Sequence, residues 1–307
     1  MIGVNHAALL ICALVLDALF GEPEWLWRRA PHPAVLMGRL IGWCDARFNR
    51  GRYRKARGIA VMAVLGLGAL LLGAGVAALP LGGLWSVLIA AVLLAQRSLA
   101  EHVGAVACAL RLGLPEACRA VARIVSRDTR GMEGGAVARG AIESAAENLS
   151  DGVVAPALWF LVAGLPGLLL YKITNTADSM IGYRTPRHLE FGWAAARFDD
   201  LLNLIPARVT ALLIAVVHGR LDAGAVVLRD APLHRSPNAG WPEAAMAVCL
   251  DVQLSGPRSY DGAVRDYPLV HPEGRAAMGA DEIDASVKAL WRTWAALLVL
   301  AVGLALI

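Results

Sequence analysis

Residues 58–79, GIAVMAVLGLGALLLGAGVAAL, form an apolar run of 22 residues without a charged side chain. A helix needs about 20 apolar residues to cross the hydrocarbon core of a bilayer. The run contains Gly66, Gly68, Gly73 and Gly75, and small residues allow helices to pack closely in lipid. This stretch therefore predicts a membrane-spanning helix.

The composition of the whole chain agrees with a membrane protein. Of 307 residues, 57% are hydrophobic and 18% are charged, with a mean hydropathy of +0.55, whereas soluble domains carry about 25% charged residues. The net charge is only +4, without the strong basic face that nucleic-acid binding requires. The five cysteines show no CxxC spacing, which argues against a zinc site.

Five further apolar segments are candidates for membrane helices: 5–20, 84–100, 153–170, 201–217 and 290–307. Pro and Gly residues interrupt 153–170, and Pro206 and Arg208 interrupt 201–217. Broken helices at membrane depth are tolerated where they pack within protein or line a cavity.

We therefore predict an all-α, polytopic integral membrane protein with about four to six transmembrane or re-entrant helices. It is expected to form a single membrane-embedded domain over residues 1–307. Amphipathic helices are expected in its polar loops, which are 21–57, 101–152, 171–200 and 219–289.

A dense basic stretch predicts the orientation. Its six cations fall within eleven positions that contain no acid: Arg47, Arg50, Arg52, Arg54, Lys55 and Arg57. The positive-inside rule places this loop in the cytoplasm. Residues 171–200 then face outward if 153–170 and 201–217 both cross. Two alternatives stay open, a re-entrant 153–170 or a fold-back of 171–200 into a cavity.

The first polar motif is residues 126–152, SRDTRGMEGGAVARGAIESAAENLSDG, in which Arg139, Glu143, Glu147 and Asp151 recur every four residues. On a helix they share one face. That face is either solvated, with an Arg–Glu pair four residues apart, or a carboxylate cluster that binds Mg²⁺, with arginines on a phosphate.

The second polar motif is residues 171–184, YKITNTADSMIGYR. As a helix it has an apolar side of Ile173, Ala177, Met180 and Ile181. The opposite face carries Lys172, Asn175, Thr176 and Ser179, with Asp178 at its edge. A lysine and an amide near an acid suit anion binding and the orientation of a carboxyl group. The alternative is a polar cap beside a membrane span.

Three shorter features have equally open interpretations. Asp199 and Asp200 precede Asn203, and these acids either complement a helix dipole or bind a metal. Residues 235–240 form a turn before a helix, which is either an anion site or an ordinary capped loop. His32 is a base, a ligand or simply a hydrogen-bonded side chain.

The common nucleotide-binding and hydrolase motifs are absent from the sequence. It contains no GxxxxGK[ST], GxGxxG, GxSxG or HExxH. If the protein uses ATP, it does so outside the common ATP-binding folds.

Taken together, these stretches resemble the CobD/CbiB family of adenosylcobinamide-phosphate synthases. The resemblance covers nearly the whole chain, and ESAAENLSDG and NTADSMIGYR are its most specific parts. It is carried by DALFGEP at 17–23, HPAVLMG at 32–38, SRDT at 126–129, ESAAENLSDGVVAP at 143–156, KITNTADSMIGYR at 172–184, FDDLLNLIPAR at 198–208, SPNAGWPEAAMA at 236–247 and SGPRSYDG at 255–262.

The resemblance implies an ATP-dependent acid–amine ligase of the cell (inner) membrane. Such enzymes join the free propionate carboxyl of adenosylcobyric acid to (R)-1-amino-2-propanol phosphate, or to aminopropanol. ATP and Mg²⁺ are the implied cofactors. The implied partners are the lipid bilayer and other cobalamin-assembly enzymes, and nucleic acid is not among them.

For this chemistry we assign roles from the residue types. Mg²⁺ would be bound by Glu143, Glu147 and Asp151 or Asp178. Lys172 and Arg184 would hold the transferring phosphoryl group, and His32 is a possible base. Glu147 and Asp178 are also candidate catalytic residues, beside Lys172. Substrate would be bound by Arg130, Arg139, Asn148, Asn175, Ser179, Arg235 and Asn238.

Two other functions are compatible with the sequence. A corrinoid transporter would account for the interrupted segments and Arg208, although no inverted repeat is visible. A non-catalytic membrane scaffold for cobalamin enzymes is the second, although residues 126–208 are dense in carboxylates, amides and arginines.

Overall fold

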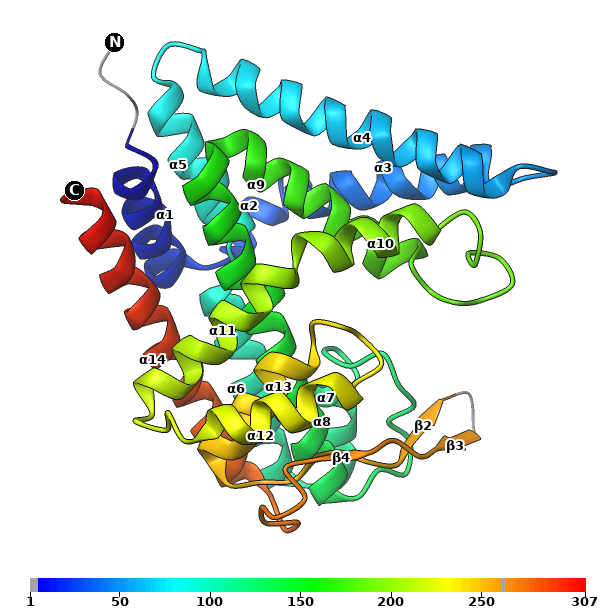
Figure 1. Cartoon of the computed structure of the whole chain (residues 1–307), viewed down its shortest axis with the longest axis vertical. Helices are drawn as coiled ribbons and strands as arrows, with labels where there is room; N and C mark the ends of the chain where they lie inside the picture. Colours follow the sequence, from blue (N-terminus) through cyan, green and yellow to red (C-terminus); the bar gives the residue numbers. More distant parts are fainter. Residues whose placement is uncertain (1–4, 261–262) are drawn as a thin grey trace. The chain divides into compact units, whose positions relative to one another are not determined.

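The computed structural model describes residues 5–260 and 263–307 and is almost entirely helical (Figure 1). The chain divides into two compact units. Unit 1 comprises Met1–Ala95, Ala155–Asn203 and Leu300–Ile307. Unit 2 comprises Gln96–Val154 and Leu204–Val299.

Four helical stretches of the described chain are long and apolar enough to cross a membrane: Arg54–Ala77, Gly82–Leu112, Gly134–Ile181 and Ala280–Ala305. A fifth is bent by 44° between α10 (Trp193–Leu202) and α11 (Leu204–Val217). The prediction of an all-α polytopic membrane protein is confirmed. Of the predicted segments, 5–20 forms only a short helix, α1 (His6–Phe20).

Helix α9 (Ala155–Ile181) is the centre of unit 1. It contacts α1, α3 (Pro33–Phe48), α4 (Arg54–Ala77), α5 (Gly82–Leu93) and α10, and α3, α4 and α9 lie side by side (Figure 1). A short helix, α2 (Glu24–Trp27), precedes α3. Ile173, Ala177 and Ile181 of α9 are buried in the core, as the sequence predicts, but Met180 is 38% exposed.

The predicted interruption of 153–170 lies at Gly164, which has a φ of 62° inside α9. The break leaves a backbone carbonyl for another donor, and His6 Nδ1 lies 3.3 Å from the oxygen of Leu161. A Cβ at position 164 would lie 2.8 Å from the His6 ring. Glycine is therefore required here both by φ and by close packing.

The contact between α4 and α9 depends on Gly73. A Cβ at this position would lie 2.5 Å from Pro166 Cα and 2.6 Å from Pro166 N. We expect Gly73→Ala to lower the free energy of unfolding by about 1–3 kcal/mol, because backbone atoms must move apart. Gly75→Ala on the same helix meets nothing within 4 Å and is the control. Equal thermal unfolding midpoints of the two variants in detergent would contradict this packing.

Unit 2 is built around α8 (Gly134–Leu149), which continues into a π-helical turn, Ser150–Val154. Such turns are rare and frequent at functional sites. Helix α13 (Gly240–Leu250) contacts α8, α11 and α12 (Ala223–Asp230). The remaining helices of the unit are α6 (Gln96–Leu112), α7 (Leu114–Val121), the 3₁₀ turn Ala231–Leu233, and α14 (Ala280–Ala305).

Four short strands follow α13 in two antiparallel pairs. β1 (Leu254–Ser255) pairs with β4 (Leu269–Val270), and β2 (Arg258–Tyr260) pairs with β3 (Ala263–Arg265). Leu254 lies opposite Val270, and both side chains are buried. The predicted polar segment 219–289 is thus ordered by α12, α13 and these strands, although residues 261–262 of its SGPRSYDG motif lie outside the described part.

Candidate functional site

Unit 2 contains a buried ionic cluster centred on Glu143, which is 4% exposed. One carboxylate oxygen accepts a hydrogen bond from Arg127 Nη2 at 2.6 Å. The other accepts bonds from Arg258 Nη2 at 3.1 Å and from the Ser255 N–H at 2.7 Å. We call Arg127, Glu143, Ser255 and Arg258 the Glu143 cluster. A buried carboxylate persists only when it is paired and hydrogen-bonded, and here both conditions are met.

The surrounding sequence holds Arg127 in place. Ser144 Oγ donates to the oxygen of Ile124 at 2.7 Å, and this bond fixes the segment between α7 and α8 three residues before Arg127. Gly140 provides space for the guanidinium, since a Cβ there would lie 2.6 Å from Arg127 Nη2. The SRDT stretch and α8 therefore form one local unit.

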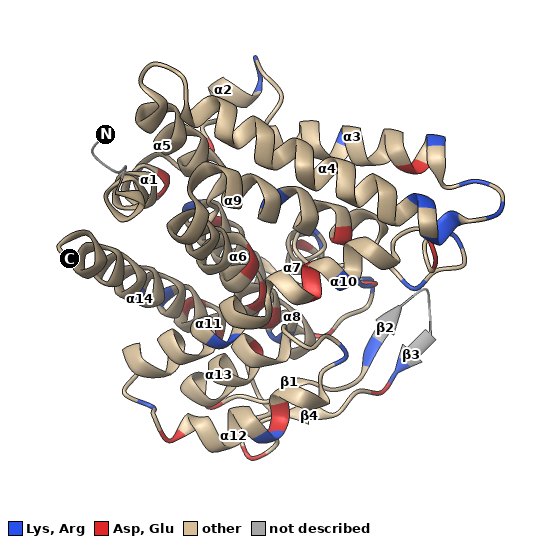
Figure 2. Cartoon of the chain, turned by 45° about the horizontal axis from the view of Figure 1, so that its top comes forward, with Lys and Arg blue, Asp and Glu red and all other residues tan. Residues whose placement is uncertain are grey.

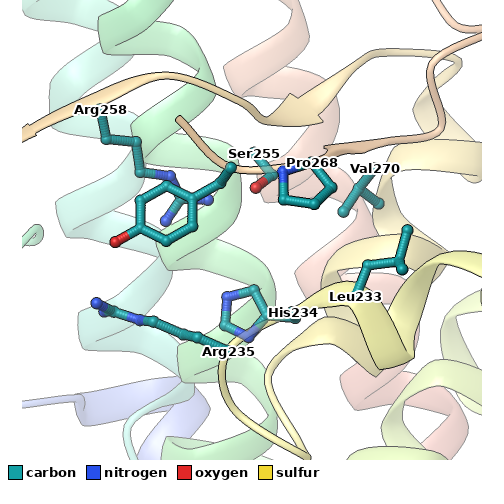
Figure 3. Close-up of a pocket in the computed structure, with 8 residues that line it drawn as sticks. Leu233, His234, Arg235, Ser255, Arg258, Pro268 and Val270 are labelled. Atoms are coloured by element: carbon teal, nitrogen blue, oxygen red, sulfur yellow. The ribbon is translucent and has the colours of Figure 1, made fainter. Parts of the chain in front are cut away.

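A small pocket lies next to the Glu143 cluster (Figure 3). Ser255 and Arg258 belong both to the cluster and to the pocket wall, and the Arg258 guanidinium lies 5.6 Å from the centre of the Tyr267 ring. Two guanidinium groups on one pocket favour a phosphate or carboxylate. The lining residues are Leu233, His234, Arg235, Ser255, Arg258, Tyr267, Pro268 and Val270.

His234 and Glu243 form a second buried pair. His234 Nδ1 accepts a hydrogen bond from the Ser236 N–H at 3.1 Å, and its Nε2 lies 3.6 Å from Glu243 Oε1. Burial, with the charges of Glu143 and Glu147, raises the pKa of Glu243 well above its usual range. Burial and then the charge of Arg258 lower the pKa of His234 to about 4. His234 is therefore uncharged near neutral pH, and burial favours the protonated form of Glu243.

The low pKa of His234 predicts acid sensitivity. The unfolded chain binds a proton near pH 6.5, but folded His234 does so only near pH 4. Stability is therefore lost as the pH falls below 6.5, by about 2 kcal/mol at pH 5. The decrease in thermal unfolding midpoint from pH 7 to pH 5, measured in detergent, should be smaller for His234→Asn than for the wild type. Equal falls would show that His234 is not buried in its neutral form.

The other predicted residues of 126–152 lie around this cluster or on the surface. Glu147 is exposed and lies within electrostatic range of Arg127, Arg235 and Arg258. Asn148 Nδ2 donates to the backbone oxygen of Ser144 at 2.9 Å. Arg130 is exposed, and Asp151 lies half-buried in the π-helical turn.

The interpretation of Arg139 and Glu143 as an ion pair four residues apart is wrong. Within the described residues Glu143 bonds Arg127 and Arg258 instead. Arg139 Nε is buried without a hydrogen-bond partner in that part of the chain. The partners of Glu143 thus come from other segments of the chain and not from its own helix.

The predicted Mg²⁺ ligands do not form one pre-assembled set. Among the residues that the structure describes, no group of three or more His, Cys, Asp or Glu side chains is arranged to hold a metal ion. Glu143 is already paired with Arg127 and Arg258. Mg²⁺ usually takes only one or two carboxylates together with substrate phosphates and water. Glu147 and Asp151 fit that need and stay predicted ligands.

Unit 1 contains a separate polar network around Asp199, which is 8% exposed. Asn175 Nδ2 donates to Asp199 Oδ1 at 3.2 Å, and Asn203 Nδ2 donates to Asp199 Oδ2 at 3.0 Å. Tyr171 Oη donates to Asn203 Oδ1 at 3.1 Å. The charge of Asp178 acts on Asp199. The structure thus brings the predicted motifs 171–184 and 197–208 together.

The interpretation of Asp199 and Asp200 as acids at a helix start is wrong. Helix α10 begins at Trp193, so both acids lie in its last turns. Asp200 pairs instead with Arg197 at 3.4 Å, and the charge of Arg184 also acts on it.

The remaining predicted residues of unit 1 differ in exposure. Ser179 and Arg184 are exposed, whereas Lys172 is half-buried.

His32 caps α3: its Nδ1 accepts from the Ala34 N–H at 3.1 Å. Its Nε2 lies 3.2 Å from the oxygen of Val92. Both ring nitrogens are in use, which favours the hydrogen-bonded alternative for His32 over the base.

The turn at 235–240 is mainly a capped loop. Ser236 Oγ accepts from the N–H groups of Asn238 and Ala239 at 3.2 and 3.3 Å. Asn238 Oδ1 accepts from Arg208 at 3.1 Å, and the Arg208 guanidinium lies 4.3 Å from the centre of the Trp241 ring. Arg235 is exposed and lines the pocket. Among these residues, Arg235 is therefore the best placed to meet a ligand.

Sequence reasoning missed five residues of the site: Arg127, His234, Glu243, Ser255 and Arg258. All but His234 lie inside stretches that carry the family resemblance. The usable signal was Glu143 itself, because an acid in an otherwise buried helix requires cations from elsewhere in the chain.

Comparison with known proteins places this chain in a family. The family model described as CobD/Cbib protein matches residues 10–290. The chain is 52% identical to the cobalamin biosynthesis protein CobD of Sinorhizobium sp. over 296 residues, which cover 91% of this chain and 92% of the relative.

Two further proteins of the same name show similar agreement. The relative from Brucella anthropi is 45% identical, with 97% of each chain covered. The relative from Rhodobacter capsulatus is 49% identical, with 89% of this chain and 90% of the relative covered. No solved structure matches the chain. The chain belongs to the CobD/Cbib family of cobalamin biosynthesis proteins.

Proposed function

We propose that the protein is an ATP-dependent carbon–nitrogen ligase of the inner cell membrane. It would join the free propionate carboxyl of adenosylcobyric acid to the amine of (R)-1-amino-2-propanol phosphate, or of aminopropanol. The observation that carries this proposal is the pocket of unit 2. There the buried Glu143 cluster presents Arg258 on the same pocket as Arg235, and both arginines lie within electrostatic range of Glu147.

The reaction needs activation of a carboxylate, which is a poor acyl donor. Transfer of a phosphoryl group from ATP would give an acyl phosphate and ADP. The amine would then attack the acyl carbon, form the amide and release inorganic phosphate. Cationic groups stabilise the charge on a transferring phosphoryl group, and we assign this role to Lys172 and Arg184.

The pocket of unit 2 suits the phosphate of the amine substrate. Arg235 and Arg258 offer planar donors that match phosphate oxygens. His234 is uncharged near neutral pH, and burial favours the protonated form of Glu243, which carries no negative charge to repel an anion there. Arg130 and Arg139 remain further candidates for phosphate binding, and Asn148, Asn175, Ser179 and Asn238 for orientation.

Mg²⁺ would neutralise charge on the phosphates when bound, and Glu147 and Asp151 are the carboxylates that would hold it. The attacking amine must also lose a proton. Glu147 and Asp178 are our candidates to accept it, since a positioned carboxylate can act as a general base.

The broken helices keep a corrinoid transporter as the second candidate. Gly164 interrupts α9, and the α10–α11 pair is bent by 44°, which are features of transporters. A transporter or a scaffold does not make an amide bond, so an assay without compartments separates these functions.

The test uses the full chain purified in detergent with adenosylcobyric acid, aminopropanol phosphate, ATP and Mg²⁺. We expect adenosylcobinamide phosphate and ADP in equal amounts, detected by mass spectrometry, and no product when ATP is omitted. Aminopropanol in place of its phosphate shows which amine is used. Absence of product from a monodisperse, folded preparation with either amine would reject the ligase and favour the transporter or the scaffold.

A further inference from the structure

Helix α3 (Pro33–Phe48) exposes an apolar stripe. Leu36, Leu40 and Trp43 are 50%, 45% and 58% exposed, and their spacing of four and three residues places them on one helix face. The inner face of α3 is different, because Ile41 and Cys44 are buried. With 16 residues, α3 does not qualify as a membrane span. Its outer face is therefore an apolar surface that the described chain leaves uncovered.

A strongly basic turn follows this stripe. Residues 47–57 comprise the end of α3, the connecting turn and the start of α4, and they contain six cations and no acid. Figure 2 shows Lys and Arg gathered there. We call this stretch the basic turn. Arg47, Arg50, Arg52 and Arg57 are exposed. The neighbouring acids are already engaged, since Asp45 pairs with Arg187 at 2.6 Å and Glu190 pairs with Arg54 at 3.5 Å.

No carboxylate of the described chain neutralises Arg47, Arg50 or Arg52. Tyr53 is 75% exposed in the same turn, and Lys55 Nζ lies 4.1 Å from the centre of the exposed Trp193 ring. Basic and aromatic side chains gather at the level of lipid headgroups. The turn thus combines anion-binding groups with the aromatic residues typical of a membrane interface.

We propose that the basic turn and the outer stripe of α3 form a binding site for an anionic phospholipid. The headgroup phosphate would lie on Arg50, Arg52 and Arg47, and an acyl chain would lie along Leu36, Leu40 and Trp43. A free phosphate would use the arginines but leave the stripe exposed. Exposed apolar side chains next to unpaired cations therefore favour a lipid over a soluble anion.

The experiment compares lipids on the full chain in detergent by native mass spectrometry. Phosphatidylglycerol should bind at least tenfold more tightly than phosphatidylcholine. In the double variant Arg50→Gln/Arg52→Gln, the ratio of the two affinities should fall at least tenfold. Each basic residue near an anionic surface contributes roughly fivefold to binding. The control is Arg28→Gln/Arg29→Gln, which removes two exposed arginines outside the turn and should bind as the wild type does.

A second variant tests the stripe. Leu36→Ser/Leu40→Ser should weaken phosphatidylglycerol binding several-fold and leave the weak binding of glycerol phosphate unchanged. Monodisperse elution and an unchanged thermal midpoint show that each variant is folded. Equal binding of the two lipids, or glycerol phosphate binding as tightly as phosphatidylglycerol, would overturn the lipid site.

Discussion

Replacing Glu147 by Gln is expected to reduce the formation of adenosylcobinamide phosphate by at least about 100-fold, which is the scale of a lost general base. The Glu147 carboxylate is exposed and lies within range of Arg127, Arg235 and Arg258. Gln has nearly the same shape but neither binds Mg²⁺ as a carboxylate does nor accepts a proton. The rate is measured with the purified protein at saturating ATP.

The structure predicts that this variant remains folded. Glu147 makes no ion pair within 4 Å in the described part of the chain, and exposed substitutions of this kind usually change stability by less than about 0.5 kcal/mol. Glu133→Gln is the matched control, since Glu133 is an exposed acid at the start of the same helix without a capping bond. Wild-type turnover in Glu147→Gln would remove Glu147 from the site.

Replacing Glu143 by Gln is expected to lower the free energy of unfolding by about 3–5 kcal/mol. The substitution leaves Arg127 and Arg258 buried with no carboxylate, and an uncompensated buried charge is strongly destabilising. Both arginine side chains are at most 10% exposed, so they are poorly placed to recover the lost interaction from water. The thermal unfolding midpoint in detergent measures the effect.

A triple variant separates stability from function. Replacing Glu143, Arg127 and Arg258 together by Met removes all three buried charges and should recover much of the stability, as replacement of buried ion pairs by apolar residues often does. It should remain inactive, because Arg258 no longer lines the pocket. A Glu143→Gln variant as stable as the wild type would show that the Glu143 cluster is hydrated rather than buried.

Hydropathy located the four long helical spans but not their ends, and it also selected 5–20, which forms only a short helix. The last helix begins at Ala280, ten residues before the predicted segment 290–307. Its polar first turns are held by tertiary ion pairs, in which Arg111 binds Asp281 and Asp284 at 2.6 and 2.7 Å. Such pairs between distant positions are invisible to a hydropathy window.

The carboxylates of the candidate site were predictable because they lie on one helix. The four-residue spacing on α8 identified the carboxylates Glu143 and Glu147. Their partners come from far along the chain, since Ser255 and Arg258 are 112 and 115 residues from Glu143. Periodicity reports which residues share a helix face, but it does not report which loop covers that face. Asn238 was assigned to substrate binding and His32 to base catalysis without knowledge of their partners. These partners are Arg208 and the Val92 carbonyl, which lie far along the chain.

The most direct test of the ligase mechanism follows the oxygen atoms of the substrate carboxyl. Adenosylcobyric acid labelled with ¹⁸O in its free propionate is incubated with the purified protein, ATP and aminopropanol phosphate, and the products are analysed by mass spectrometry. Activation as an acyl phosphate predicts one ¹⁸O atom in inorganic phosphate for each amide formed, with ADP as the nucleotide product. Label in AMP, or amide formation without consumption of ATP, would contradict it.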